Sequence, residues 1–327
     1  MSVATHQLLL ALDYGGTKHT AALLVPGEQA WLAHGRVYAP PGADGAWDQA
    51  AMLRLARELL AQHPGRLAAI GVSFGGPVDA GRGVVRLSHH VPGWEETPLR
   101  DRLQAELVAP VAVDNDANVA ALGEWRFGAG QACDSVFYVT VSTGVGGGWV
   151  LGGRIWSGAD GMAGEIGHNV VRPGGVPCVC GKAGCVEAEA CGWGIAAKAR
   201  RRLDEGQKTK DEGERLLALS GGRADGVTAQ MVAQAAAEGD ALAQELLYGA
   251  AEALGMGIGA ALNLMNPQRV VLGGGITKSG ERWWQIVRET ARAHALPQTS
   301  AEIVPAAMGD DAPLWGAAAL AGSLIRA

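Results

Sequence analysis

The strongest constraint on the fold is a layout of three strands and two turns that occurs twice in the chain. The first copy is LLLALDYGGTKHTAALLVPGEQAWLAHGRV, near the N-terminus, and the second is SVFYVTVSTGVGGGWVLGGRIWSG. Each copy reads as an apolar strand, a polar glycine turn, a second strand, a further turn with glycine and a third strand. When the two copies are aligned with Asp13 opposite Ser142, Gly15 aligns with Gly144. Two copies of one supersecondary unit predict a duplicated architecture with a cleft between its halves.

Further strands alternate with helices between and after these copies. LAAIGVSFGGPVD, VAPVAVDNDANVAALGEW and RVVLGGGI each contain an apolar strand that runs into a polar or glycine-rich turn. Helical patterns are predicted over residues 49–62, 228–264 and 313–325, and ERWWQIVRETARAHA reads as a further helix. Asn266-Pro267 is expected to end the second of these helices. The alternation predicts an α/β fold.

Length and charge limit the class of protein. A chain of 327 residues can form two domains, and a formal net charge of −6 with a pI near 5.8 favours no nucleic-acid partner. The apolar run at residues 8–12 is short and has no basic lead, which favours a strand over a signal peptide. The longest apolar stretch, residues 253–262, is about half of what a membrane span requires. We therefore expect a cytoplasmic protein without a membrane partner, in which thiols stay reduced.

Three glycine turns, within DYGGTK, STGVGGG and LGGGI, each follow a predicted strand. Ligands of α/β proteins usually bind at such strand ends, and glycines let backbone N–H groups approach an anion closely. None of the turns is a Walker P-loop or a GxGxxG dinucleotide fingerprint. Together they predict a site for the phosphates of a nucleotide.

The same turns carry a resemblance to a known superfamily. Asp13-Tyr14-Gly15-Gly16-Thr17-Lys18, Ser142-Thr143-Gly144 and Gly273-Gly274-Gly275 resemble the two phosphate turns and the adenosine turn of the hexokinase/actin-type ATPases. Within it, DNDANVAALGE and GEIGH…CVCGKAGCVE resemble the ROK family (repressors, open reading frames and sugar kinases), above all its bacterial glucokinases. The match covers nearly the whole chain in order.

The resemblance implies a two-domain α/β fold of the actin/hexokinase type, which is ribonuclease H-like, with a cleft between the domains. Residues 1–118 with 312–327 would form a small N-terminal α/β domain, to which the final helix returns. Residues 119–311 would form a large α/β domain that carries the cysteine-rich loop.

That loop, HNVVRPGGVPCVCGKAGCVE, holds three of the five cysteines. A disulfide framework and a metal site are the alternatives, and a reducing compartment together with an odd number of cysteines favours the metal. The residues His168, Cys178, Cys180 and Cys185 supply a complete tetrahedral set for Zn²⁺, and the ROK signature has the same arrangement. Four protein ligands leave no open position, so we expect a structural zinc. Cys133 and Cys191 are assigned to packing.

Two glutamates flank the ligands. Glu165 precedes His168 by three residues, and Glu187 follows Cys185 by two, so a fixed loop would aim both carboxylates at one place. The second ring nitrogen of His168 can face the same place. Most glutamates are merely exposed, but the resemblance implies that these three side chains bind the C1–C3 edge of a sugar.

The polar run in VAVDNDAN follows a strand and precedes a helix, where an N-cap would account for one Asp or Asn but not for four. The resemblance implies that Asp116 is the catalytic base, that Asn115 binds sugar hydroxyls and that Gly76 offers a backbone contact to the sugar. GWEETPL, residues 93–99, resembles the sugar-side loop of the family. Asp13 would hold Mg²⁺ through water. The expected nucleotide-binding residues are Asp13, Gly15, Gly16, Thr17, Thr143, Gly144, Gly274 and Gly275.

The resemblance therefore implies an ATP-dependent hexose kinase, with glucose as the expected substrate and glucose 6-phosphate as the product. The alternatives are an N-acetylmannosamine, N-acetylglucosamine or fructose kinase of the same family, or a non-enzymatic ROK sugar sensor. Polyphosphate could replace ATP without leaving a motif in the sequence. A homodimer, or a tetramer, is expected by resemblance alone.

Overall fold

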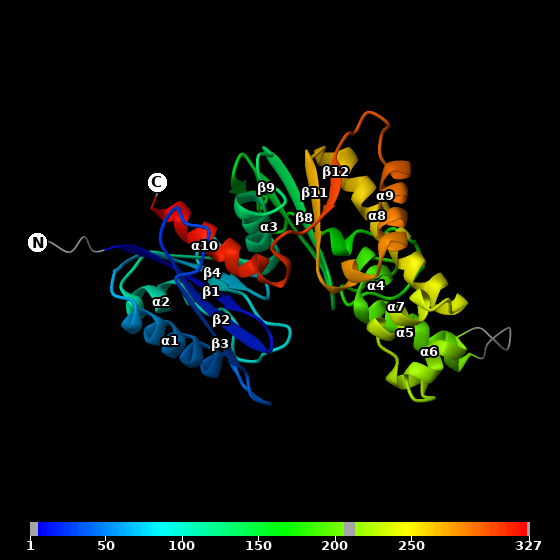
Figure 1. The fold of residues 1–327 in the computed structure, drawn as a ribbon, viewed down its shortest axis with the longest axis horizontal. Coiled ribbons are helices and arrows are strands. Elements are labelled where there is room, and N and C mark those ends of the chain that lie inside the picture. Colours follow the sequence, from blue (N-terminus) through cyan, green and yellow to red (C-terminus); the bar gives the residue numbers. More distant parts are fainter. Residues whose placement is uncertain (1–5, 206–212, 326–327) are drawn as a thin grey trace, which may run out of the picture. The chain divides into compact units, whose positions relative to one another are not determined.

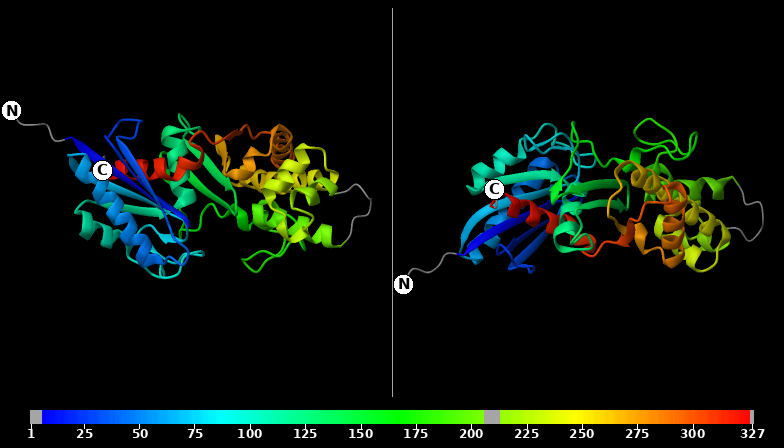
Figure 2. Two further views of the ribbon diagram at one scale, coloured as in Figure 1. Left: turned by 60° about the horizontal axis from the view of Figure 1, so that its bottom comes forward. Right: turned by 90° about the horizontal axis from the view of Figure 1, so that it is seen from above.

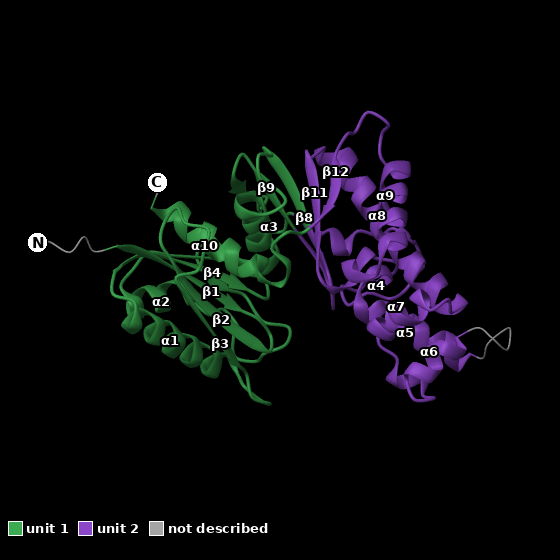
Figure 3. Cartoon of the chain, viewed as in Figure 1, with its two compact units in different colours: residues 1–138, 148–163, 306–327 green, residues 139–147, 164–305 purple. Residues whose placement is uncertain are grey.

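The computed structural model describes residues 6–205 and 213–325 (Figure 1; two further views in Figure 2). These residues divide into two compact units, coloured separately in Figure 3. Unit 1 comprises residues 1–138, 148–163 and 306–327, and unit 2 comprises residues 139–147 and 164–305. The chain therefore passes between the units more than once.

Unit 1 is built on a five-stranded sheet with the order β3-β2-β1-β4-β7. Strands β1, β4 and β7 are parallel neighbours, and β2 and β3 run as antiparallel hairpin partners at the other edge. Apart from the portions of the second sheet that fall in this unit, its strands and helices are β1 (Gln7–Tyr14), β2 (Lys18–Leu24), β3 (Ala33–Tyr38), α1 (Gly45–Gln62), β4 (Arg66–Phe74), β5 (Val78–Asp79), β6 (Val84–Val85), α2 (Leu99–Leu107), β7 (Val111–Asn115), α3 (Asp116–Phe127), η4 (Gly309–Asp311) and α10 (Ala312–Leu324).

Both faces of this sheet are covered, as the apolar run Leu8 to Leu12 in β1 requires. Side chains alternate along a strand, so Leu10 and Leu12 pack with Met52 of α1 on one face. Leu9 and Ala11 pack with the α10 helix on the other face. Figures 1 and 2 show α1 and α10 on these opposite faces.

The second sheet has the order β10-β9-β8-β11-β12. Its strands are β8 (Ser135–Val141), β9 (Val145–Leu151), β10 (Arg154–Ile155), β11 (Arg269–Gly273) and β12 (Glu302–Pro305). In both sheets the third, second and first strands of the predicted layout lie in that order, followed by two later strands. The predicted duplication is therefore confirmed by the topology, and the two aligned glycine turns occupy the same place in their sheets.

Unit 2 carries most of the helices. They are η1 (Ile166–His168), α4 (Val186–Ala190), α5 (Gly192–Asp204), α6 (Glu214–Leu219), η2 (Ala224–Gly226), α7 (Ala229–Ala237), α8 (Ala241–Met265), η3 (Gly275–Lys278) and α9 (Glu281–His294). The helical pattern predicted over residues 228–264 is divided between α7 and α8, because Gly239 has a positive φ of 96° and Asp240 caps a new helix by accepting from Ala243 N at 2.9 Å. Helix α8 ends as predicted, with Asn266 in the left-handed region.

Helix α10 belongs to unit 1 although it ends the described chain. It packs so closely on α3 that a Cβ atom added at Gly316 would lie 1.7 Å from the carbonyl oxygen of Val119. The two units and the predicted domains divide the chain at different residues, since α3 packs with α10 inside unit 1. The predicted domain boundaries stay a prediction. Among the helices of the described residues, none combines the length and the apolar character that crossing a membrane requires.

Candidate active site and metal centre

Polar side chains of unit 1 gather where three parallel strands end. The strand register sets Asp13 of β1 opposite Ser73 of β4, and Ser73 opposite Asp114 of β7. Ser73 Oγ donates a hydrogen bond to Asp13 Oδ1 at 2.8 Å. The carboxyl ends of parallel strands meet at one edge of a sheet, which is where ligands bind in open α/β folds.

Asp116 begins α3 directly after β7, at this same edge. Burial and, to a smaller extent, the nearby charge of Asp13 raise its pKa to about 6, against a hydrogen bond from Ala117 N at 2.9 Å. Burial also raises the pKa of Asp13, although Ser73 and Lys18 oppose the rise. Two neighbouring carboxylates repel each other when both are ionised. A bound cation or a proton on one of them would reduce this repulsion.

Asn115 has a local structural role that its sequence position only suggested. It is the N-cap of α3, because its Oδ1 accepts a hydrogen bond from Ala117 N at 2.9 Å. Its Nδ2 donates to the carbonyl oxygen of Gly76 at 3.1 Å. The N-cap alternative therefore applies to Asn115 but not to Asp114, whose carboxylate accepts from Asn118 at 3.1 Å. The structure brings Gly76 and Asn115 together, and their roles as sugar ligands stay predictions.

The first glycine turn joins β1 to β2. Gly15 N donates to Lys18 O at 3.1 Å, which closes the turn, while Gly16 and Thr17 are exposed. In unit 2, Ser142 N donates to Gly144 O at 2.9 Å, and Thr143 is exposed in the same way.

The third turn follows β11, the neighbour of β8 in the second sheet. A Cβ atom at Gly274 would lie 2.3 Å from the carbonyl oxygen of Val141, and its φ of 90° also favours glycine. Gly275 is exposed at the start of η3. The second and third turns therefore lie side by side at the ends of neighbouring strands of unit 2.

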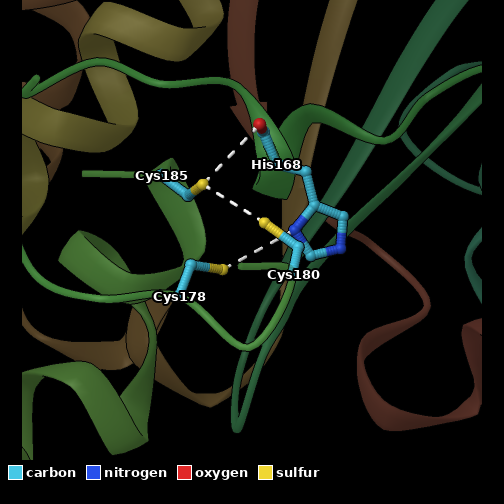
Figure 4. Close-up of side chains that lie close together, drawn as sticks. All are labelled: His168, Cys178, Cys180 and Cys185. Carbon is cyan, nitrogen blue, oxygen red and sulfur yellow. Dashed lines mark hydrogen bonds between the residues drawn. The ribbon is translucent and has the colours of Figure 1, made fainter. Parts of the chain in front are cut away.

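The four predicted metal ligands converge in unit 2 (Figure 4). His168, Cys178, Cys180 and Cys185 place one ligand atom each so that all four lie within 4.8 Å of one another. Cys178 Sγ is 3.8 Å from His168 Nδ1, and the Sγ atoms of Cys180 and Cys185 are 3.6 Å apart. Ligands bound at about 2.3 Å to one tetrahedral zinc lie roughly 3.8 Å apart, whereas a disulfide needs about 2.05 Å. The donor set therefore fits a zinc ion.

The backbone of this loop folds tightly around the ligands. Gly181 and Gly184 have φ values of 89° and 77°, in the region of backbone conformation that favours glycine. A β-bridge pairs Val170 with Cys185, and a second pairs Pro177 with Ala183.

Glu189 supports the loop, and the sequence analysis did not identify it. The carboxylate accepts from Val176 N at 2.8 Å and from Lys198 Nζ at 3.2 Å, and Arg172 lies beside it. Burial acts to raise the pKa of Glu189, but the Val176 N–H and the charge of Lys198 outweigh it, so the pKa is lowered. The available signal was a second glutamate in the alanine-rich stretch VEAEACGWGIAA, where an unpaired charge would be costly.

Glu165 lies on the other side of the His168 imidazole, and Glu187 lies near Glu165. While Nδ1 of His168 faces the sulfurs, its Nε2 lies 3.9 Å from Glu165 Oε2. Burial raises the pKa of Glu165; His168 opposes the rise, and the charge of Glu187 adds to it. Glu187 Oε2 also accepts from Val145 N at 3.1 Å, directly after the second glycine turn. The structure thus brings Glu165 and His168 together with Glu187 near Glu165, and the roles of these side chains as sugar ligands stay predictions.

Known proteins resemble the chain over most of its length. The sequence profile of the ROK family matches residues 9–323. A glucokinase of Halalkalibacterium halodurans is 39% identical over 267 residues, which are 80% of this chain and 79% of that protein. The crystal structure of the ROK hexokinase from Thermus thermophilus is 33% identical with a TM-score of 0.85, over 98% of this chain and 99% of that one. A ROK family glucokinase from Streptomyces griseus, in complex with glucose and AMPPNP, is 33% identical with a TM-score of 0.79, over 97% and 99%.

Proposed function

Because the chain belongs to the ROK family, we propose that it is an ATP-dependent glucokinase, which phosphorylates glucose at the 6-hydroxyl. The observation that carries the proposal is the Asp116 carboxylate, which follows the parallel strands of unit 1 and has a pKa of about 6. The likeness to a glucokinase solved with glucose and AMPPNP supports the choice of both substrates.

Asp116 acts as the general base. Its carboxylate accepts the proton of the 6-hydroxyl while that oxygen bonds to the γ-phosphorus of ATP, and the bond from this phosphorus to the bridging oxygen breaks to release ADP. A pKa of about 6 leaves most of the carboxylate ionised at neutral pH and makes it more basic than an ordinary aspartate, near 3.9. At neutral pH, Asp116 is therefore mostly in the form that accepts a proton, and it binds that proton more tightly than an ordinary aspartate does.

Glu165, His168 and Glu187 bind the hydroxyls at the C1–C3 edge of the sugar, and Asn115 and Gly76 contribute further polar contacts. Support comes from the position of Glu165 on the side of the His168 imidazole that faces away from the cysteines, with Glu187 close enough for its charge to act on Glu165. A sugar is recognised by such fixed polar groups because an unmatched hydroxyl leaves a buried partner unpaired.

ATP binds through the glycine turns and Mg²⁺. Thr17, Thr143 and the turn glycines Gly15, Gly16 and Gly144 hold the phosphates, while Gly274 and Gly275 contact the adenosine. Asp13 holds Mg²⁺ through water, which fits the raised pKa values of Asp13 and Asp116, since a divalent cation stabilises neighbouring carboxylates. When bound, Mg²⁺ neutralises charge on the phosphates.

One structural Zn²⁺ is held by His168, Cys178, Cys180 and Cys185. The ligand separations and the choice of three thiols with one imidazole support this assignment. Four protein ligands leave no position for substrate, so the ion acts by fixing the loop, and with it the orientation of His168 and Glu187.

A sugar panel tests the proposed activity. We expect kcat/KM with ATP, followed by ADP release, to be highest for glucose among glucose, mannose, fructose, N-acetylglucosamine and N-acetylmannosamine. A higher value for fructose or an N-acetylated sugar would make the chain a different sugar kinase, and glucose binding without ADP release would make it a sensor. Formation of glucose 6-phosphate with polyphosphate in place of ATP tests the phosphoryl donor.

Assembly and location are further parts of the proposal. A homodimer, or a tetramer, is supported by the resemblance to the family, and sedimentation equilibrium would measure it. A cytoplasmic location is supported by the need for ATP and for reduced thiols at the zinc site.

A further inference from the structure

A buried polar cluster of unit 1 lies outside the groups assigned above. It consists of His19, Asp48 and Trp94, whose exposed fractions are 1%, 2% and 1%. His19 belongs to β2, Asp48 to α1, and Trp94 to the segment between β6 and α2. Charged residues are almost never buried to this extent unless they are paired.

Asp48 holds the other two side chains, one with each oxygen. Its Oδ1 is 2.7 Å from His19 Nε2, and its Oδ2 accepts from Trp94 Nε1 at 3.0 Å. Among the described residues, His19 Nδ1 and the buried Tyr14 hydroxyl have no hydrogen-bond partner. Asp48 therefore provides the hydrogen bonds to both buried rings, and hydrogen bonds to a carboxylate are the strong kind.

The two partners of Asp48 belong to two different segments that the proposed site uses. His19 pairs with Tyr14 in the β1–β2 hairpin, and this pair lies next to the first glycine turn. Trp94 belongs to residues 93–99, the expected sugar-side loop. Its ring meets the Tyr14 ring edge-on at 5.5 Å between centroids.

The loop also rests on the start of α1. Gly45 N donates to Pro92 O at 2.8 Å, and a Cβ atom at Gly45 would lie 2.6 Å from Gly93 O. Asp48 follows one turn later in the same helix, so the backbone contact and the Trp94 indole hold the loop from one helix end.

We propose that Asp48 is a positioning residue, which sets the affinity for glucose by fixing residues 93–99 against the hairpin of the first glycine turn. The inference rests on the proposed glucokinase activity. Asp48 itself contacts no reacting atom, since it is buried between His19 and Trp94. Its loss leaves two buried donors without a partner, and the cheapest response is movement of the loop that carries one of them.

The test compares three variants of the full-length protein. D48A is expected to raise the KM for glucose about tenfold, the effect of losing one strong hydrogen bond, with a smaller change in the KM for ATP. D48N is expected to restore most of the affinity, because the amide can accept from Trp94 and donate to His19. W94F, which removes the N–H but keeps an aromatic ring, is expected to raise the KM for glucose as D48A does.

D44A is the matched control in the same helix. Asp44 is the N-cap of α1 and accepts from Trp47 N at 2.9 Å, so its loss costs about 1 kcal/mol of stability. D44A should lower Tm without changing the KM for glucose. If D48A folds and has the KM of D44A, or if W94F has the KM of the wild type, the positioning role is wrong. A wild-type protein that does not phosphorylate glucose would instead contradict the proposed function.

Discussion

The chemistry of Asp116 follows from the raised pKa of its carboxylate. The carboxylate is surrounded by protein and lies near a second one, Asp13, so its pKa rises to about 6. The D116N variant keeps the shape of the side chain and leaves the N-cap of α3, Asn115, unchanged. It cannot accept a proton from a hydroxyl.

We expect D116N to lower kcat about 10²–10⁴-fold, which is the usual contribution of a general base. The Kd for glucose should change little, because the other sugar ligands remain. Steady-state kinetics and calorimetric titration with glucose measure the two quantities. D101N, the same change in the first turn of α2, is the control. A fully active D116N protein would remove Asp116 from the mechanism.

The same pKa predicts how activity and stability depend on pH. kcat/KM for glucose should fall below about pH 6, as Asp116 becomes protonated. The pKa of Asp116 in the folded, substrate-free protein lies above the unfolded value near 3.9, so the folded state binds this proton more tightly than the unfolded state. The folded state is therefore destabilised as the pH rises from about 4 to 6, where the unfolded chain has already lost the proton. The Tm of D116N minus that of the wild type should therefore increase across this interval and then level off. A difference that is constant from pH 4 to 8 would contradict the raised pKa.

At the scale of elements, the loop from His168 to Cys185 is rich in glycine and leaves Val170 and Val179 exposed, so it buries little apolar surface of its own. Its order depends on two β-bridges, on Glu189 and, in our proposal, on zinc. The binding energy of a structural zinc is folding energy. Loss of one zinc ligand should therefore both lower the stability of the protein and change the orientation of Glu187 on α4.

We expect about one zinc per chain in protein purified without chelator, and a large loss of zinc in C180S. C180S should also lower Tm and raise the KM for glucose together. C133S is the control, because Cys133 is partly buried outside the cluster. Elemental analysis, thermal unfolding and kinetics give the three readouts. Absence of zinc from the wild type, or full zinc content in C180S, would contradict the assignment.

At the scale of the molecule, unit 1 is completed by the last described helix of the chain. Helix α10 covers the face of the sheet formed by Leu9 and Ala11, and it touches α3 through glycines. Most of unit 1 precedes residue 139, yet one face of its core depends on residues after 305.

G316A tests this close packing. A Cβ atom at Gly316 would lie 1.7 Å from Val119 O, a backbone atom that moves only if the helices separate. Overpacking of this kind costs about 1–3 kcal/mol or more, so a clear fall in Tm is expected. G322A in the same helix meets only Leu9 Cδ1 at 3.7 Å, and alanine favours a helix over glycine, so its Tm should stay near or above that of the wild type. Equal Tm values for the two variants would contradict the packing.

Local chemistry made much of the fold and of the site predictable. Glycine turns at strand ends, an Asp-Asn cap before α3, an Asn-Pro stop after α8 and a Cys₃His ligand set are each encoded within a few neighbouring residues. The repeated strand layout likewise predicted the two matching sheets. The division between α7 and α8 was missed, because the helical pattern continues across Gly239 and Asp240.

Tertiary structure decided what depends on residues far apart in the chain. The raised pKa of Asp116 requires burial and the nearby charge of Asp13, and neither is evident from the neighbouring residues in the sequence. The same holds for Asp48, an ordinary acidic residue near a helix start until His19 and Trp94 are packed onto it. Burial and charge interactions depend on distance in space, so their consequences appear only once the chain has folded.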